Sequence, residues 1–279
     1  FRRARARGPD LPEAHASLAN ALVAAGRLDE AEAHARRAVA AEPGRAAHYL
    51  TLSNVLRAQS RVVEALVACR QALTLDPDSA DGHATLGNAL TGHGKPEEAV
   101  ESYRRALALR PDLAKARSNL IFVLDFDPRV GSAEAFAERR RFNEAHARPL
   151  ACAVLPHTND PTPDRRLRIG YVSPDFREHS AAAVFGPVLH THDREHFDVV
   201  CYSDVVVPDD RTARFQAAAT EWRSTVGVTD ADLAATIRAD RIDILVDLAG
   251  HSAGNRLLVF ARKPAPIQVT AWGHALGTG

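Results

Sequence analysis

Two histidines in short polar loops are the residues of this sequence best suited to acid–base chemistry or to hydrogen bonding with a substrate. His179 lies in the loop 173–180 (SPDFREHS) and His251 in the loop 250–256 (GHSAGNR). An imidazole that titrates near neutrality can accept a proton or bind a hydroxyl group. For His179 a structural role is the alternative, because it could cap a helix that begins near Ser180.

Other residues near these histidines could complete a binding site. Asp175 lies four residues before His179 in the same loop and could orient its ring. Ser252 lies in a loop with two glycines, which allow the backbone to approach a ligand closely.

The elements that must position these loops alternate between strand and helix. Apolar runs predict strands at 167–172, 197–202, 225–228, 242–248 and 267–272, and the segments between them predict helices at 181–190, 212–219, 230–240 and 257–262. This alternation is typical of an α/β layer with a parallel sheet. Because parallel strands all end at the same edge of a sheet, we expect the loops 173–180, 250–256 and 273–279 to share that edge. Ligands of such sheets bind beyond the carboxyl ends of the strands.

The first half of the sequence repeats with a period of 34 residues. Pro43, Pro77 and Pro111 recur at this spacing, with leucines and alanines in register between them. The pattern resembles the tetratricopeptide repeat, in which each copy forms two helices that bury their apolar faces by stacking. We expect three full copies and a fourth that begins at Ala114 and breaks at 125–128.

One polar column follows the same period. Asn20, Asn54 and Asn88 occupy equivalent positions on the first helix of each copy, on the side that lines the concave groove in this repeat family. Stacked amides can bond the backbone of an extended peptide whatever its sequence. The alternative is that these side chains solvate the groove or bridge adjacent helices.

Between the halves, residues 132–150 are predicted to form an amphipathic helix, and the proline-rich segment 153–166 a linker. The expected domains are therefore a repeat array over 1–127, a connector over 128–164 and an α/β lobe over 165–279. The boundary between the folded parts is expected near residue 160.

Composition limits the classes of partner and compartment. Lys+Arg and Asp+Glu both number 35 in 279 residues, which gives no electrostatic case for binding nucleic acid or a membrane surface. Cys69, Cys152 and Cys201 are odd in number and lack histidines at metal-ligand spacing, so we expect no metal and a cytoplasmic location. No Met is present and residue 1 is Phe1, which indicates part of a longer chain.

Three stretches resemble the O-linked N-acetylglucosamine transferase and SPINDLY family. They are RLRIGYVSPDFREHSAAAVFGPVL, IRADRIDILVDLAGHSAGNRLLVFARKPAPIQV and the ending GHALGTG. The resemblance implies a tetratricopeptide superhelix followed by the Rossmann-like N-terminal lobe of a GT-B glycosyltransferase. It implies transfer of N-acetylglucosamine from UDP-N-acetylglucosamine, a donor substrate with no cofactor, to Ser or Thr of proteins held in the repeat groove.

The resemblance also assigns roles to residues. It implies a catalytic cleft with His179 and His251, contacts to substrate or donor from Asp175, Ser252, Gly277 and Thr278, and a peptide groove with Asn20, Asn54 and Asn88. Members have Tyr-Pro where this sequence has His274-Ala275. They carry a catalytic lysine and nucleotide-binding loops in a second lobe, which we expect beyond residue 279, so these residues alone should be inactive. The alternatives are a non-catalytic tetratricopeptide scaffold and a member that uses a fucosyl donor.

Overall fold

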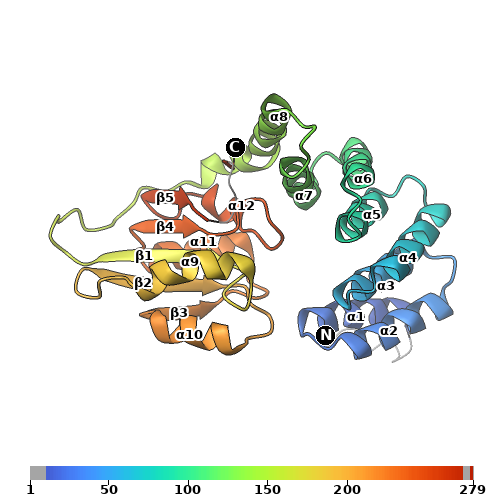
Figure 1. The fold of residues 1–279 in the computed structure, drawn as a ribbon, viewed down its shortest axis with the longest axis horizontal. Helices are drawn as coiled ribbons and strands as arrows, with labels where there is room; N and C mark the ends of the chain where they lie inside the picture. Colours follow the sequence, from blue (N-terminus) through green and yellow to red (C-terminus); the bar gives the residue numbers. More distant parts are fainter. Residues whose placement is uncertain (1–10, 273–276, 279) are drawn as a thin grey trace. The chain divides into compact units, whose positions relative to one another are not determined.

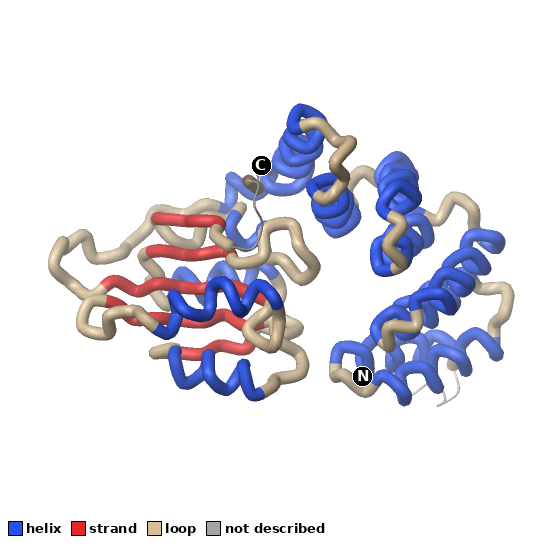
Figure 2. Tube along the Cα trace, in the orientation of Figure 1, coloured by secondary structure: helices blue, strands red, loops and turns tan. Residues whose placement is uncertain are grey.

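The computed structural model describes residues 11–272, Gly277 and Thr278. Contacts divide the chain into two compact units, Phe1–Val130 and Gly131–Gly279. The first is helical and the second contains a sheet covered by helices (Figures 1 and 2). No helix in the described part of the chain is long and apolar enough to cross a membrane.

The first unit confirms the predicted repeats. Its helices pair in sequence order and a seventh begins a fourth copy: α1 Pro12–Ala24, α2 Leu28–Ala41, α3 Ala46–Ala58, α4 Val62–Leu75, α5 Ala80–Gly92, α6 Pro96–Leu109 and α7 Ala114–Asp125. Small residues set the close approach of paired helices. A Cβ atom on Gly87 would lie 2.7 Å from the ring of Tyr103, so α5 and α6 can pack at this distance only with glycine there.

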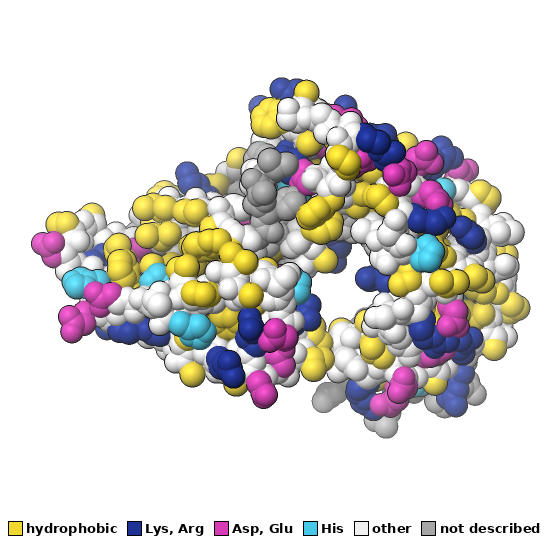
Figure 3. All heavy atoms as spheres, in the orientation of Figure 1, with side chains coloured by type: hydrophobic (Ala, Val, Ile, Leu, Met, Phe, Trp, Pro, Cys, Tyr) yellow, Lys and Arg dark blue, Asp and Glu magenta, His cyan; other side chains and the backbone are white. Residues whose placement is uncertain are grey.

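Charged side chains of both signs cover the repeat unit (Figure 3). Many form ion pairs: Arg61, for example, pairs with Glu32 and Glu64, each at 2.6 Å. Exposed pairs of this kind contribute little to stability, about 0–1 kcal/mol each. The stability of this unit therefore comes chiefly from its buried alanines and leucines.

The connector is shorter as an α-helix than the sequence predicted. Helix α8 spans Ser132–Phe142 and is followed by a π-helical turn, Asn143–Ala147, and a 3-10 helix, Arg148–Ala153. The α-geometry cannot continue to residue 150 because Pro149 has no N–H to donate to the preceding turn.

The proline-rich segment after the connector is fixed to the second unit. Asn159 Nδ2 donates to Asp243 Oδ1 at 2.7 Å. Arg165 donates to both carboxylate oxygens of Asp243, at 2.7 and 2.5 Å. Composition indicated a linker here, and the structure shows a bonded strap (residues 154–166) that belongs with the sheet.

The sheet of the second unit is parallel throughout, as predicted. Its strands are β1 Leu167–Ser173, β2 Phe197–Ser203, β3 Glu221–Ser224, β4 Ile244–Asp247 and β5 Ile267–Thr270, in the order β3-β2-β1-β4-β5. The prediction of a strand at 225–228 was wrong. That segment turns because Gly227 has φ +77°, and the strand lies just before it.

Helices cover both faces of the sheet (Figures 1 and 2). On one face, α9 (Ser180–His190) and α10 (Asp210–Ala218) pack on alternate strand residues such as Tyr171 and Cys201. On the other, α11 (Asp230–Ala239) and α12 (Leu257–Phe260) pack on the intervening residues such as Val172 and Tyr202. The near-continuous apolar runs of the strands follow from this double burial.

Candidate functional site

The strand order places the topological switch point of the sheet between β1 and β4. These strands are neighbours, and Val172 of β1 lies opposite Asp247 of β4 near their carboxyl ends. The chain leaves β1 toward α9 on one face and leaves β4 toward α12 on the other. Ligands of open α/β sheets bind where successive connections diverge in this way. The loops with His179 and His251 flank that point, as expected from the sequence.

Three strands end in the same local turn. The side-chain oxygen of the last strand residue accepts the backbone N–H two residues later: Ser173 from Asp175 at 2.9 Å, Ser203 from Val205 at 3.3 Å and Asp247 from Ala249 at 3.0 Å. Asp247 also accepts from Gly250 at 2.9 Å. These side chains are almost fully buried, so they direct the loops over the sheet edge instead of contacting substrate.

His179 is the N-cap residue of α9, the structural role considered from the sequence. Its Nδ1 accepts the backbone N–H of Ala181 at 3.2 Å, so in the neutral ring the proton lies on Nε2. In that tautomer Nε2 donates a hydrogen bond and cannot accept a proton. The side chain is 38% exposed, which leaves it accessible to a substrate.

Asp175 lies close enough to change this tautomer. Its Oδ2 is 3.7 Å from Nδ1 of His179 and its side chain is mostly buried. If the imidazole ring rotates and its proton moves to Nδ1, Nδ1–H can donate to Asp175. Nε2 then carries a lone pair, which is the form that a general base needs. Burial raises the pKa of Asp175, although the charges of His179 and Arg177 oppose that rise.

Helix α10 contacts and fixes the loop that contains His179. Asp209 caps α10, and its Oδ2 also accepts the backbone N–H of Glu178 at 2.7 Å. Arg211 pairs with the carboxylate of Glu178 at 2.9 Å. Sequence reasoning missed Asp209, because its capping box signals only a helix start and not a contact with a loop 31 residues earlier.

His251 is much less accessible than His179. It is 1% exposed, and its Nε2 donates to the carbonyl oxygen of Thr278 at 3.0 Å. Its ring meets Phe142 of α8 edge-on, with centroids 4.9 Å apart. The structure therefore brings His251 and Thr278 together, but through a backbone carbonyl in a buried position.

The two candidate loops contact each other through a glycine. Gly254 has φ +79°, and a Cβ atom there would lie 2.9 Å from Cβ of Pro174. Ser252 is half-buried in the same loop, and its carbonyl oxygen accepts from Asn255 at 2.8 Å. Arg256 fixes the end of the loop through two hydrogen bonds to Asp204, at 2.6 and 2.7 Å.

The end of the sequence is described only in part. The carbonyl oxygen of Gly277 accepts from Arg139 Nε at 2.5 Å. His274 and Ala275, where the sequence departs from the family pattern, lie outside the described residues. Arg139 was not predicted, because no local pattern marks a contact that spans 138 residues.

The three asparagines of the repeat unit differ in their exposure and in their hydrogen bonds. Asn20 is exposed and Asn54 half-buried. The Oδ1 of Asn88 accepts from Tyr103 at 2.8 Å and from Asn119 at 2.7 Å, so it bridges neighbouring helices, which was the alternative considered. A peptide could engage only the amide donors of Asn88.

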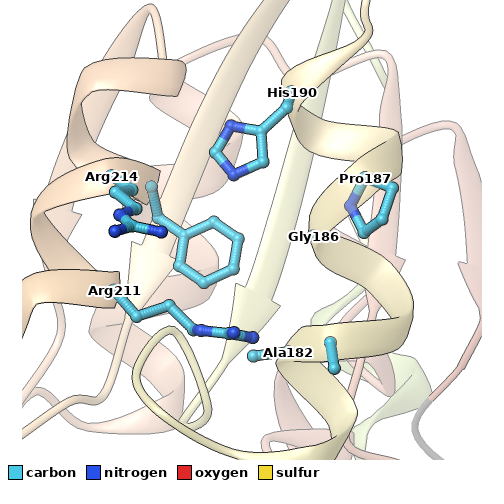
Figure 4. A pocket seen from close by; sticks show the side chains of 8 residues that line it. Ala182, Gly186, Pro187, His190, Arg211 and Arg214 are labelled. Atoms are coloured by element: carbon cyan, nitrogen blue, oxygen red, sulfur yellow. The ribbon is translucent and has the colours of Figure 1, made fainter.

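A separate pocket of about 260 Å³ lies between α9 and α10 (Figure 4). Arg211 and Arg214 extend from α10 toward α9, and His190 stacks on Phe215 with ring centroids 5.5 Å apart. None of the predicted site residues lines it. Among the described residues, no group of three or more His, Cys, Asp or Glu side chains could hold a metal ion.

Curated relatives match up to half of the chain. The probable UDP-N-acetylglucosamine–peptide N-acetylglucosaminyltransferase SPINDLY of Oryza sativa subsp. japonica is 42% identical over 125 residues, which are 43% of this chain and 14% of that protein. The UDP-N-acetylglucosamine–peptide N-acetylglucosaminyltransferase of Caenorhabditis elegans is 32% identical over 144 residues, 50% of this chain and 12% of that protein. The chain thus spans a small part of these relatives.

A solved structure matches both units. It is a mutant of the O-GlcNAc transferase of Thermobaculum terrenum, with a TM-score of 0.88 and 35% identity. The match covers 94% of this chain and 50% of that one. Tetratricopeptide profiles match residues 1–46, 16–80 and 87–123, and the profile of glycosyl transferase family 41 matches residues 140–279, half of the chain. The resemblance inferred from the sequence is confirmed, and the chain belongs to glycosyl transferase family 41.

Proposed function

We propose that this chain forms the repeat array and the first catalytic lobe of a protein O-glycosyltransferase that transfers N-acetylglucosamine from UDP-N-acetylglucosamine to Ser or Thr side chains. The similarity to a solved O-GlcNAc transferase over 94% of the chain carries the proposal. The loops that flank the topological switch point between β1 and β4 are where that reaction would place its chemistry.

In this proposal His179 contacts the reacting groups. With Nδ1 bonded to Ala181, its Nε2–H can donate to an oxygen of the acceptor or the donor sugar. With Nδ1–H turned to Asp175, its Nε2 can take the proton of the acceptor hydroxyl. Ser252 is a contact to donor or acceptor. The resemblance implies a second lobe with a lysine and nucleotide-binding loops, so activity is expected of a protein that has both lobes.

A transfer assay with two donors tests the proposal. The natural protein is incubated with a Ser/Thr peptide and either UDP-N-acetylglucosamine or GDP-fucose, and mass spectrometry identifies the added sugar. We expect N-acetylglucosamine. Fucose would assign the other donor, and peptide binding without transfer would favour the scaffold. His179→Ala should abolish most transfer without changing peptide affinity, while His196→Ala, an exposed histidine of the same unit, should change neither.

The partners follow from the repeat unit. We propose that protein acceptors bind its groove, with Asn20 and Asn54 bonding the peptide backbone. Replacement of both by Ala should weaken peptide binding without lowering the melting temperature, whereas Asn88→Ala should lower the melting temperature because Asn88 bridges helices.

We also propose a cytoplasmic location, which the free cysteines support: Cys69 and Cys201 are buried and Cys152 is exposed.

A further inference from the structure

The buried side chain of Arg139, in helix α8 of the connector, contacts Gly277 near the end of the sequence. Arg139 of α8 is 3% exposed. Its Nε donates to the carbonyl oxygen of Gly277 at 2.5 Å and its Nη1 to that of Ala135 at 3.1 Å. Burying a guanidinium is costly unless its donors are satisfied. The bond to Gly277 therefore ties the exposed backbone of that residue to a buried side chain.

The next residue is held by a side chain from another element. His251, in the loop after β4, donates from Nε2 to the carbonyl oxygen of Thr278 at 3.0 Å. Its ring rests edge-on against Phe142, at the point where α8 becomes a π-helical turn, and such turns are frequent at functional sites. Helix α8 thus helps to fix both carbonyl groups. It bonds that of Gly277 directly through Arg139, and it supports the bond to Thr278 through the contact of Phe142 with His251.

We propose that Arg139 and His251 are positioning residues that hold the carbonyl groups of Gly277 and Thr278 and so aim the backbone amide between them at the diphosphate of the donor. This inference rests on the proposed transferase function. In a trans peptide the C=O and N–H point in opposite directions, so fixing the carbonyl of Gly277 toward α8 turns the N–H of Thr278 away from it. A preoriented amide stabilises negative charge without reorganising during the reaction.

In this arrangement His251 has a different role from the one expected from the sequence. From the sequence it was a catalytic candidate, but a ring that is 1% exposed and bonded to a backbone carbonyl has little access to an acceptor hydroxyl. Its contribution is to the shape of the donor site. His179, with its exposed ring, is the histidine that contacts substrate in the proposal.

Neighbouring arginines of α8 provide a matched test in the natural protein. Arg139→Gln should raise the KM for UDP-N-acetylglucosamine by about 10- to 100-fold, the effect of losing one charged hydrogen bond, with a smaller change in kcat. Arg140→Gln removes the same charge from an exposed side chain and should change neither. Arg139→Lys keeps a charge and a donor and should restore part of the affinity.

Hydrogen exchange supplies a readout that does not depend on transfer. The amide of Thr278 should exchange faster in Arg139→Gln and not in Arg140→Gln. An unchanged KM together with unchanged exchange would overturn the inference, as would equal effects of the two variants. If the natural protein transfers no sugar, the proposed function fails, and the exchange experiment still decides whether Arg139 holds the turn.

Two variants of His251 separate positioning from catalysis. His251→Gln retains an N–H donor for Thr278, and His251→Phe retains only the ring that packs on Phe142. We expect the Gln variant to keep most of its donor affinity and the Phe variant to lose it, both with modest changes in kcat. Loss of kcat in both variants at unchanged KM would make His251 a catalytic residue and refute its assignment here.

Discussion

Two carboxyl groups lie buried near the carboxyl ends of β1 and β4, and their protonation affects both stability and chemistry. Burial raises the pKa of Asp247, although bonds from the N–H groups of Ala249 and Gly250 and from Thr270 oppose the rise. Burial likewise raises the pKa of Asp175 beside His179. The first shapes a loop and the second faces a candidate catalytic ring, so substitutions at the two positions should have different consequences.

Replacing Asp247 by Asn should change how stability depends on pH. Because the pKa of Asp247 is higher in the folded than in the unfolded protein, its contribution to stability is greatest below the unfolded pKa and falls as pH rises through the window up to the folded pKa. The difference in unfolding free energy, variant minus wild type, should therefore increase with pH by up to about 1.4 kcal/mol per unit. Urea titrations from pH 4 to 7 measure it, and parallel curves would contradict the expectation.

Replacing Asp175 by Asn should slow transfer by about 100-fold, the scale of one general acid–base contribution, because the acceptor that can take Nδ1–H from His179 loses its charge. Peptide affinity should not change. Asp193→Asn is the matched control, since Asp193 forms an exposed pair with His196 at 2.6 Å in the same unit. Equal rates for wild type and Asp175→Asn would show that the capping tautomer of His179 is the functional one.

At the scale of elements, helix starts and strand ends determine where the loops lie. Helix α10 holds the loop of His179 through Asp209, which bonds its own helix and the backbone of Glu178. Helix α11 is capped in a similar way by Thr229, which accepts the N–H of Asp232 at 3.2 Å. One cap therefore serves only its helix, and the other also serves the candidate site.

The paired caps allow a direct comparison. Asp209→Ala and Thr229→Ala should each destabilise the second unit by about 1 kcal/mol, as measured by denaturant unfolding. Only Asp209→Ala should also speed hydrogen exchange at Glu178 and lower the rate of transfer. A Thr229→Ala variant with the same loss of transfer would mean that general stability, and not the position of the loop, limits the reaction.

Periodicity predicted the elements well, because each pattern reflects burial that the structure contains. The repeat helices follow the 34-residue spacing, and the strands follow apolar runs that are covered on both faces. Local errors arose where one residue overrode a pattern, as Gly227 did at β3 and Pro149 in the connector. The contacts of Arg139 and Asp209 could not be predicted, because they join segments far apart in sequence.

At the scale of the whole molecule, each unit has its own hydrophobic core, and the strap over residues 154–166 belongs to the second. Asp243 joins this strap to the sheet. Burial alone would raise the pKa of Asp243, but hydrogen bonds from Arg165, the N–H of Arg168 and Asn159 hold it below its ordinary value. The charged carboxylate is therefore the form that stabilises the fold.

Removing the partner of Asp243 should destabilise the second unit alone. Arg165→Gln should lower its unfolding free energy at pH 7 by about 1–3 kcal/mol, because a buried carboxylate loses charged bonds. The loss should shrink as pH falls through the lowered pKa, where the carboxyl group is protonated in either variant. Arg166→Gln, which breaks a more exposed pair with Asp198, is the control. A similar loss in that control would argue against the strap as a specific fastening.

The turns at the ends of β1, β2 and β4 have a consequence for how this sheet edge can change in evolution. Each begins with a bond between residues two apart, so its first bend is encoded within three consecutive positions. The remainder of a loop can then be lengthened, shortened or replaced while the strand and its turn are retained. Exchange of loop segments between related enzymes, with Ser173 and Asp247 kept, offers a route to new acceptor preferences on an unaltered sheet.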